Sequence, residues 1–320
     1  MNPAERKALS VAVGVIRGAD GRVLISKRKG SSHLSGLWEF PGGKLEAGED
    51  VFTALCRELG EELNIVVTQA HPLIRIHHQY ETFDVLLQVW CVDSFEGTAS
   101  GHEGQEIAWV TQQDLPNYEF PPANLSIISA ARLPKFYAIV EDADARVDVL
   151  LQRCLSLLNR DDCIVQLRAK YLAQSQYIDL ADQLCKVAHS NGTTLLLNCE
   201  PQLARQLGAS GVHLSSERLM QLDDRPLDRD FWVAASCHNQ KELQHACNME
   251  LDFAVLSPVK ATRSHPGVKS IGWDQFESWV ENSNVPVFAL GGLQINDLEC
   301  AQAHGGQGIA GIRAFVEEGL

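Results

Sequence analysis

The sequence lacks any apolar run long enough to span a membrane, and its first residues, MNPAERKALSVAVGV, lack the apolar core and cleavage site of a signal peptide. It also lacks an excess of positive charge, because 27 Lys and Arg stand against 41 Asp and Glu, a formal net charge of -14. We therefore expect no nucleic-acid partner and no membrane partner. The nine cysteines form no C-x-x-C pair, which is typical of reduced, buried thiols. These absences predict a cytoplasmic protein.

A glycine- and serine-rich spacer is absent as well, although 320 residues are enough for two domains. The pattern changes near Pro134, so we predict one domain over residues 1–134 and a second, docked against it, over residues 135–320. The first domain mixes β-rich and helical patterns, and the whole chain therefore combines α+β and α/β architecture. The expected elements are strands over Ser10–Ile16, Val23–Lys27, Val85–Val92 and Ile107–Val110, and helices over Val51–Leu63 and from Ala123 to before Pro134.

From Lys135 onward, eight strand-like runs alternate with helical or linking segments. Consecutive β-α units imply parallel strands joined by right-handed crossovers, and eight of them predict a (β/α)8 TIM barrel. At roughly 185 residues the barrel is short for this fold, so we expect compact helices and loops. The runs are FYAIVE, CIVQLRA, TTLLLN, GVHLS, WVAASCH, FAVLSP, VPVFALGG and GQGIAGI.

Three carboxylates stand at helical spacing in the first domain. Glu58, Glu61 and Glu62 occupy positions i, i+3 and i+4, so a helix places them on one face. Like charges this close destabilise a helix unless a cation lies among them, and oxygen ligands of this kind suit Mg2+ or Mn2+ bound to substrate phosphates. A solvated acidic face is the alternative, but it does not explain Glu49 and Arg57 in register. Arg57 is placed to pair with Glu49 and hold the preceding loop against the helix.

The stretch GGKLEAGEDVFTALCRELGEELNI, residues 42–65, is similar to the Nudix box, G-x5-E-x7-R-E-U-x-E-E-x-G-U, in which U is aliphatic. Asn64 replaces the last Gly of the box, and Asn is the residue that next best tolerates the positive φ that ends a helix. The resemblance implies an α/β/α sandwich that hydrolyses a pyrophosphate bond with Mg2+ or Mn2+. The matching residues are Gly43, Glu49, Arg57, Glu58, Leu59, Glu61, Glu62 and Ile65.

Beyond the box, residues 10–134 resemble the MutT-type Nudix hydrolases, which convert 8-oxo-dGTP to the monophosphate. The segments that carry this resemblance are ISKR, WEFPGGKLEAGE, HEGQE and FPPAN. It implies that Glu58 also partners the attacking water. Asn124 would hydrogen-bond the oxidised purine, and a wrong base that left the amide unpaired would cost about 1–3 kcal/mol. The implied metal ligands are Glu58, Glu61, Glu62, Glu103 and the Gly42 carbonyl, and the implied nucleotide contacts are Arg28, His33, Phe40 and Asn124. Taken singly, Phe40 is equally a core residue, Arg28 a surface residue and Asn124 a helix cap.

The second domain resembles the thiamine phosphate synthase and TenI superfamily over residues 135–320. The matching segments fall at the carboxyl ends of predicted strands, where barrel enzymes place their sites. The resemblance implies a phosphorylated small molecule as ligand, and solvated strand ends are the structural alternative. The implied contacts are Gln166, Arg168 and Lys170, with phosphate-binding backbone at Gly291, Gly292 and Gly311.

Two positions depart from the synthases. Where that family has Mg2+-binding aspartates, this sequence has Cys199 and Arg218, and neither a thiol nor a guanidinium replaces a hard oxygen ligand well. We therefore do not expect metal-assisted loss of pyrophosphate. TenI-type thiazole tautomerases need no such metal and use an acid/base histidine near the end of strand five, where His238 stands. The barrel is then a tautomerase-like enzyme or a non-catalytic binder or scaffold.

The leading hypothesis is hydrolysis of 8-oxo-dGTP by the first domain, which would remove an oxidised nucleoside triphosphate from the nucleotide pool. The alternative hypothesis is based on the occurrence of the two domains in one chain. In that case the first domain hydrolyses a pyrophosphate of thiamine metabolism, and the barrel serves the same pathway.

Overall fold

The computed structural model describes residues 8–29, 34–80, 83–141, 146–262 and 267–315. It divides the chain into two compact units, residues 1–132 and 133–320. Within the described ranges no helix is both long and apolar enough to cross a membrane.

The N-terminal unit contains a mixed sheet in the order β3-β2-β1-β6-β5. β1 (Leu9–Arg17) pairs in parallel with β6 (Asp84–Glu96), and β6 forms an antiparallel hairpin with β5 (Val66–Gln79). On its other side β1 pairs antiparallel with β2 (Val23–Lys27). Three short strands complete the sheet: β3 (Trp38–Glu39) and β7 (Ile107–Val110) pair with β2, and β4 (Gly42–Lys44) pairs with β1.

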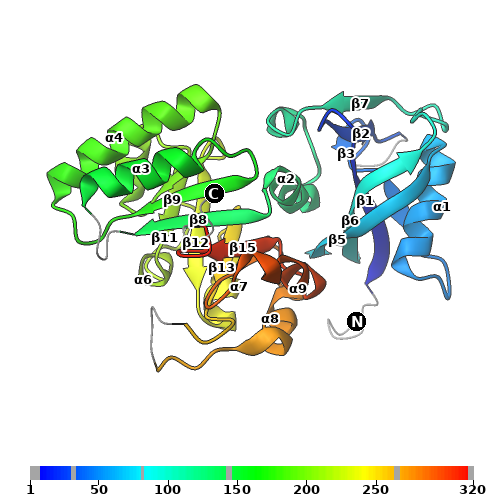
Figure 1. Ribbon diagram of the computed structural model, residues 1–320. Helices are drawn as coiled ribbons and strands as arrows, with labels where there is room; N and C mark the ends of the chain where they lie inside the picture. The colour runs from blue at the N-terminus through cyan, green and yellow to red at the C-terminus, as the bar shows by residue number, and fades with distance from the viewer. Residues whose placement is uncertain (1–7, 30–33, 81–82, 142–145, 263–266, 316–320) are drawn as a thin grey trace. The chain divides into compact units, whose positions relative to one another are not determined.

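The alternation of side chains along β1 explains why two helices cover this sheet. Ala12 and Ile16 pack in one cluster with the apolar side of α1 (Val51–Leu63). Val13 and Val15 pack in a separate cluster with α2 (Leu125–Arg132). Figure 1 shows α1 and α2 on opposite sides of the sheet. The predicted α/β/α sandwich is confirmed, while β5 is a strand that the sequence analysis did not predict.

The C-terminal unit is a closed barrel of eight parallel strands in the order β10-β11-β12-β13-β14-β15-β8-β9. Every strand-like run from residue 136 onward has become a barrel strand, and the predicted (β/α)8 architecture is confirmed. The strands are β8 (Phe136–Glu141), β9 (Cys163–Arg168), β10 (Leu195–Leu197), β11 (Gly211–Leu214), β12 (Trp232–Cys237), β13 (Phe253–Leu256), β14 (Val287–Ala289) and β15 (Gly308–Gly311).

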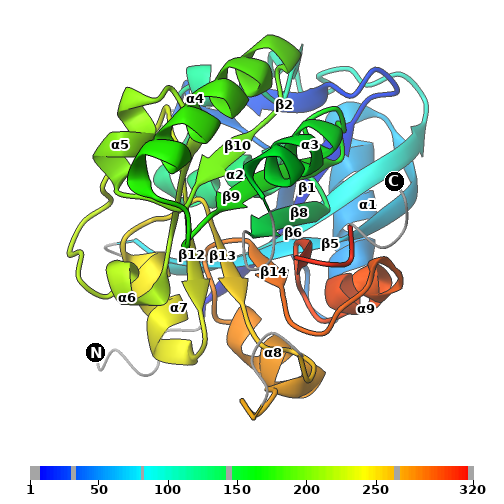
Figure 2. The same cartoon turned by 60° about the vertical axis from the view of Figure 1, so that its left-hand side comes forward.

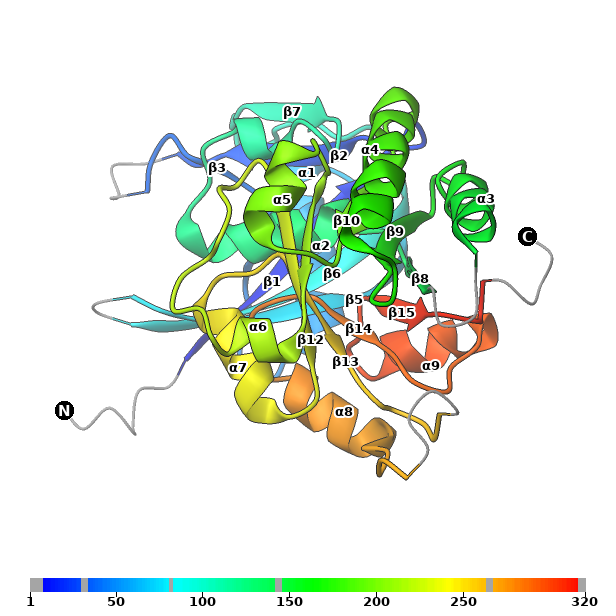
Figure 3. The same cartoon turned by 90° about the vertical axis from the view of Figure 1, so that its left-hand side faces the viewer.

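Helices lie outside these strands, as Figures 2 and 3 show for the C-terminal unit. Three of them are only four to six residues long, which explains how the barrel closes in so short a chain. Inside the barrel, Tyr137, Phe253 and Phe288 form a contiguous aromatic group with ring centroids 5.2–5.8 Å apart. The helices are α3 (Val147–Leu157), α4 (Gln174–Asn191), α5 (Pro201–Gln206), α6 (Ser216–Leu219), α7 (Gln240–Asn248), α8 (Gly272–Val280) and α9 (Leu298–Ala303).

Candidate active site

The acidic helix α1 is fixed at both ends by local chemistry. Asp50 caps its start, because its carboxylate accepts a hydrogen bond from the Thr53 amide at 3.0 Å. Asn64 ends it in the left-handed conformation, at φ 56°, and its amide donates to the Gly60 carbonyl at 3.0 Å. The residue that departs from the box therefore adopts the backbone conformation expected of the glycine it replaces.

The two glycines of β4 bring backbone and carboxylates into contact. The Gly42 amide donates to Glu62 Oε2 at 3.1 Å. At Gly43 a Cβ would lie only 2.1–2.2 Å from the Glu58 carboxyl group, so this carboxylate rests directly on the glycine backbone. Any side chain at position 43 would displace Glu58, which explains why glycine occupies this position.

Arg57 connects the loop to the helix. Its Nε and Nη2 donate to the two oxygens of Glu49 at 3.0 and 2.9 Å, the bidentate arrangement that the spacing predicted. Nη2 also donates to the Lys44 carbonyl at 3.1 Å, and Nη1 donates to Glu58 at 2.9 Å and to Glu61 at 3.3 Å. These hydrogen bonds lower the pKa of Glu49 and raise that of Arg57. Arg57 thereby positions Glu58 while holding the loop in place.

Glu62 is the electrostatic centre of the site. Burial raises its pKa to about 7, the Gly42 hydrogen bond opposes that rise, and the charges of Glu39, Glu58 and Glu103 add to it. Gly42 also ties Glu62 to β4, whereas the side chain of Glu61 is 59 % exposed and contacts Arg57. Three carboxylates thus act on a fourth, Glu62, beside the glycine turn.

Glu103 reaches this group through the loop that precedes β7. The Glu62 carbonyl accepts hydrogen bonds from the His102 amide and from Gln105 Nε2, both at 2.9 Å. Gln105 Oε1 in turn accepts from the Glu103 amide at 3.0 Å. The main chain at the end of α1 therefore fixes the loop that carries Glu103, although some 40 residues separate the two in sequence.

This donor set fits a divalent cation with a preference for oxygen. Burial and the charges of Glu39, Glu58 and Glu103 raise the pKa of Glu62. A cation among them would offset both effects. Carboxylate and backbone carbonyl oxygens are the ligands of Mg2+ and Mn2+, and the described residues supply them around a glycine turn that allows close approach.

The residues assigned to nucleotide contacts lie on the α2 side of the sheet or at its edge. Phe40 is buried in the core on that side and stacks on Phe120 with centroids 5.4 Å apart. Asn124 is 8 % exposed and stands at the end of a 3-10 turn, η3 (Pro122–Asn124), directly before α2. Arg28 pairs with Glu39 at 2.6 Å. His33 lies outside the described residues.

Two residues near these positions were missed from the sequence. Glu39 acts on Glu62 and pairs with Arg28, so it links the carboxylate cluster to the residues assigned to the nucleotide. Tyr80 lies close enough to Arg28 for the guanidinium charge to act on its hydroxyl, and its ring stacks on Phe83 with centroids 4.8 Å apart. Glu39 adjoins Phe40 within the WEFPGG segment, but nothing in the spacing of that segment indicated a contact with Glu62.

In the barrel, polar side chains gather at the carboxyl ends of the strands. Arg168 at the end of β9 pairs with Glu141 at the end of β8. Burial and the charge of Arg168 lower the pKa of Lys170. Gln166 is 1 % exposed, and neither atom of its amide finds a hydrogen-bond partner in the described part of the chain. A buried amide without partners costs about 1–3 kcal/mol, so this position suits a polar ligand.

His238 is exposed, and its Nδ1 lies 3.0 Å from the Ser257 carbonyl and 3.2 Å from the Ser257 hydroxyl. A second histidine, His213, was not predicted as a site residue. It is fully buried, its Nδ1 lies 2.9 Å from the Tyr137 hydroxyl, and its Nε2 lies 2.8 Å from the Ser236 hydroxyl. Burial lowers the pKa of His213 to about 3, so its imidazole is neutral at physiological pH.

The two positions that depart from the synthases do not form an oxygen-ligand site. Cys199 is buried, which raises its pKa to about 11, and the charge of Arg218 opposes that rise. Arg218 Nη2 donates to Glu200 at 2.6 Å. A neutral thiol beside a paired guanidinium does not suit Mg2+.

The three barrel glycines also have packing reasons. A Cβ on Gly291 would lie 2.8 Å from Pro258 Cα, and one on Gly292 would lie 2.3 Å from the Ala261 carbonyl oxygen. Both residues have positive φ, at 106° and 64°. At Gly311 a Cβ would lie 3.0 Å from Ala314 Cβ. Close packing alone therefore accounts for these glycines, with or without a bound phosphate.

Comparison with known proteins assigns both units. The NUDIX domain profile matches residues 12–130, and the Thiamine monophosphate synthase profile matches residues 136–315. The 8-oxo-dGTP diphosphatase of Escherichia coli is 35% identical over 123 residues, which are 38% of this chain and 95% of that protein. The CTP pyrophosphohydrolase of the same organism is 34% identical over 124 residues, 39% of this chain and 91% of that protein. A putative thiamine-phosphate synthase of Aquifex aeolicus is 31% identical over 185 residues, 58% of this chain and 99% of that protein.

Proposed function

Because the chain belongs to the Nudix hydrolases through its N-terminal domain and to the thiamine monophosphate synthase family through its C-terminal domain, we propose that it is a metal-dependent pyrophosphohydrolase of 8-oxo-dGTP with a ligand-binding barrel. We assign the hydrolase to residues 1–134 and the barrel to residues 135–320. The observation that carries the hydrolase proposal is the group of four carboxylates around Glu62, held by the Gly42 amide and by Arg57.

In this proposal water attacks a phosphorus of the triphosphate, the P–O–P bond breaks, and the products are 8-oxo-dGMP and pyrophosphate. Bound Mg2+ or Mn2+ would neutralise phosphate charge and make the water more acidic. Glu58 and Glu62 would hold it with Glu61, Glu103 and the Gly42 carbonyl. Glu58 orients the attacking water and takes its proton, and Arg57 keeps Glu58 in place against Gly43.

Base selection is assigned to the α2 side of the sheet. Asn124 would offer its buried amide to the edge of the oxidised purine, Phe40 would support the base, and Arg28 and His33 would contact the nucleotide. The burial of Asn124, which is 8 % exposed, supports a contact with the base, and Asn124→Ala distinguishes this assignment from the helix-cap alternative. An amide left unpaired by guanine would cost about 1–3 kcal/mol, which is enough to favour 8-oxoguanine clearly.

The decisive measurement compares kcat/KM with Mg2+ for 8-oxo-dGTP, dGTP, CTP and the pyrimidine pyrophosphate of thiamine synthesis. We expect 8-oxo-dGTP to be preferred over dGTP and CTP by at least tenfold. CTP belongs in the set because one relative is a CTP pyrophosphohydrolase. A preference for the pyrimidine pyrophosphate would refute the nucleotide proposal and join both domains in thiamine metabolism.

For the barrel, we propose that it binds a phosphorylated small molecule and is not a Mg2+-dependent synthase. Gln166, Arg168 and Lys170 would contact the ligand, with Gly291, Gly292 and Gly311 near its phosphate. The unpartnered buried amide of Gln166 supports binding, and Cys199 with Arg218 argues against the synthase step. His238 would act as acid and base if the barrel isomerises a thiazole phosphate.

Two assays separate the alternatives for the barrel. Turnover of thiazole phosphate by the full chain that is lost in His238→Ala would establish the tautomerase-like reading and exclude the scaffold. Growth of a strain without thiamine phosphate synthase, supported by this protein, would contradict our interpretation of Cys199 and Arg218.

A further inference from the structure

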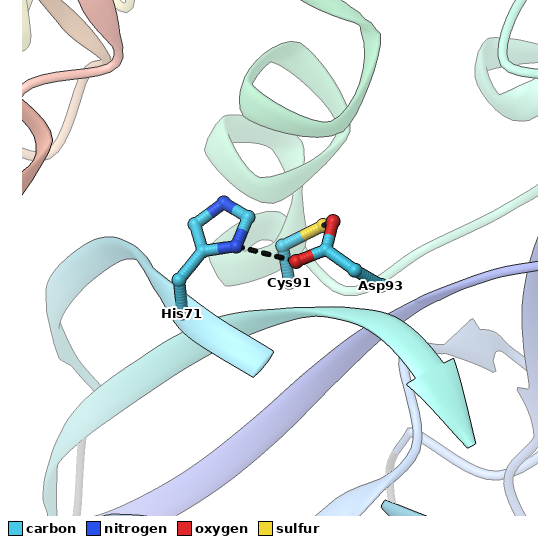
Figure 4. A group of neighbouring side chains, drawn as sticks. All are labelled: His71, Cys91 and Asp93. Carbon is cyan, nitrogen blue, oxygen red and sulfur yellow. Dashed lines mark hydrogen bonds and ion pairs between the residues drawn. The ribbon is translucent and has the colours of Figure 1, made fainter. Parts of the chain in front are cut away.

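Three side chains of different ligand types meet on one face of the β5–β6 hairpin, as Figure 4 shows. The strand register places His71 opposite Cys91, and Asp93 follows Cys91 by two residues, so all three side chains project from the same face. His71 Nδ1 lies 2.7 Å from Asp93 Oδ2, and Cys91 Sγ lies 3.8 Å from Asp93 Oδ1. One imidazole nitrogen, one sulfur and one carboxylate oxygen lie within 4.8 Å of one another.

We propose that His71, Cys91 and Asp93 form a zinc site that links β5 to β6. Nitrogen, sulfur and oxygen donors together match Zn2+ and not Mg2+, because thiolate and imidazole are softer ligands than water or carboxylate. Bonds of about 2.3 Å to sulfur and about 2.0–2.2 Å to nitrogen and oxygen put tetrahedral ligand atoms roughly 3.3–3.7 Å apart. The distance from Cys91 Sγ to Asp93 Oδ1, 3.8 Å, is close to that range, and His71 Nδ1 contacts the other oxygen of the same carboxylate, Oδ2. For both to bind one Zn2+, His71 Nδ1 and the Asp93 oxygen need to separate by less than about 1 Å, which a small side-chain rotation provides.

Burial and Asp93 raise the pKa of Cys91, and the contact of the thiol with Arg17 opposes that rise. Arg17 Nε donates to Cys91 Sγ at 3.3 Å, and Arg17 is itself held by a hydrogen bond from Nη2 to the Ala131 carbonyl at 3.0 Å. Such an N–H···S contact supports a metal-bound sulfur from its second coordination sphere. Cys91 is 3 % exposed, whereas the side chains of His71 and Asp93 are 30 % and 41 % exposed. The open side leaves a fourth coordination position to water.

The β5–β6 ladder is irregular around His71, and a metal link would stabilise it there. The β5–β6 ladder shifts register between Val67 and Gln69, between Gln69 and Ala70, and again between Pro72 and Ile74, so irregular pairing lies on both sides of His71. A metal bonded to one residue of β5 and two of β6 would hold the register where the ladder is weakest.

This site is separate from the carboxylate cluster. Val85, Leu87 and Val89 of β6 pack on the α2 side of the sheet, and Cys91 follows them with the same alternation. The cluster around Glu62 belongs to α1, which covers the opposite face. The two sites share no residue, and saturating Mg2+ keeps the carboxylate cluster occupied while Co2+ or Zn2+ binding at Cys91 is measured.

Cobalt substitution tests the proposal on the full chain after treatment with a chelator. Co2+ bound by a thiolate has an ultraviolet sulfur-to-metal charge-transfer band that carboxylate-bound Co2+ lacks. We expect this band at one equivalent of Co2+ in the wild type, its loss in Cys91→Ser, and its persistence in Cys56→Ser, a matched control on α1. Absence of the band from the wild type, or its persistence in Cys91→Ser, would overturn the proposal.

Because serine at a buried position could disturb the fold, His71→Gln provides a second variant at a part-exposed position. Zn2+ affinity, measured by competition with a chromophoric chelator, should fall at least tenfold in His71→Gln. In the same Mg2+ buffer, Zn2+ should raise the unfolding midpoint of the wild type by more than that of His71→Gln. Equal affinity and equal thermal shifts in the two proteins would mean that His71 and Asp93 form only an ion pair.

Discussion

Replacing Gly43 with alanine tests whether the contact between the glycine backbone and Glu58 matters for hydrolysis. An alanine Cβ would lie 2.1 Å from Glu58 Cδ, and carbon atoms pack about 3.5–4.0 Å apart, so the carboxylate would have to move by about 1.4–1.9 Å. A misplacement of about 1 Å in a catalytic group costs on the order of 100-fold. We therefore expect kcat/KM for the preferred substrate to fall about 100-fold, or about 2.7 kcal/mol.

The fold should survive this substitution, because Gly43 has no left-handed backbone and the atoms in the way end a flexible side chain. Gly60→Ala is the matched control on α1, since its Cβ would meet nothing closer than the Ile65 carbonyl at 3.7 Å. Alanine there should raise stability by about 1 kcal/mol and leave turnover unchanged. Glu58→Asp added to Gly43→Ala should cost less than the two single changes together, because the shorter side chain relieves the overlap. Wild-type turnover by folded Gly43→Ala would refute the reasoning.

Glu62→Gln should lower kcat/KM by about three orders of magnitude, because it removes a charged oxygen worth several kcal/mol from the cluster; steady-state kinetics that show retained turnover would contradict the metal assignment. Asn124→Ala should reduce the preference for 8-oxo-dGTP over dGTP by about tenfold or more with a smaller loss of kcat, and an unchanged ratio would leave Asn124 a structural residue. His213 has its folded-state pKa lowered from 6.5 to about 3, so its contribution to stability is complete above pH 6.5 and is lost as the pH falls below that value. From pH 7.5 to pH 5 this costs about 2 kcal/mol. In urea denaturation His213→Gln should show a correspondingly smaller pH slope, and equal slopes in the two proteins would count against this account.

The extent to which sequence predicts structure differs between the parts of the N-terminal domain. Glu49, Arg57 and Glu58 are close in sequence, so the positions of Glu49 in the loop and Arg57 on the helix were enough to predict their bidentate pairing. β5 was not predicted, because its sequence VVTQAHPLIRIHHQ contains Pro72, does not alternate cleanly and is largely exposed. Glu39 was not predicted as a site residue for a different reason. Its effect on Glu62 depends on where the tertiary fold places β3, and no local sequence pattern predicts that placement.

In the barrel, strand patterns predicted every strand, because buried parallel strands read as apolar runs between helical segments. The hydrogen bonds that link Tyr137, His213 and Ser236 could not be predicted. These residues come from three strands, and the sequence pattern does not give the relative stagger of the strands. His71, Cys91 and Asp93 were missed likewise, because their meeting depends on the register shifts of one hairpin.

Gln166 helps to decide between a ligand-binding barrel and a bare scaffold. Its amide is buried between the apolar residues Val165 and Leu167 of β9, and both of its polar atoms lack partners among the residues described. A scaffold would be more stable with an apolar residue there, because each unmet polar group costs about 1–3 kcal/mol. A ligand that hydrogen-bonds the amide would offset this cost, and Arg168 and Lys170 follow on the same strand and loop to bind an anionic group. Cys199 and Arg218 do not offer the oxygen ligands that suit Mg2+, and neither belongs to the proposed ligand contacts, so the proposal of a ligand-binding barrel does not require the synthase reaction.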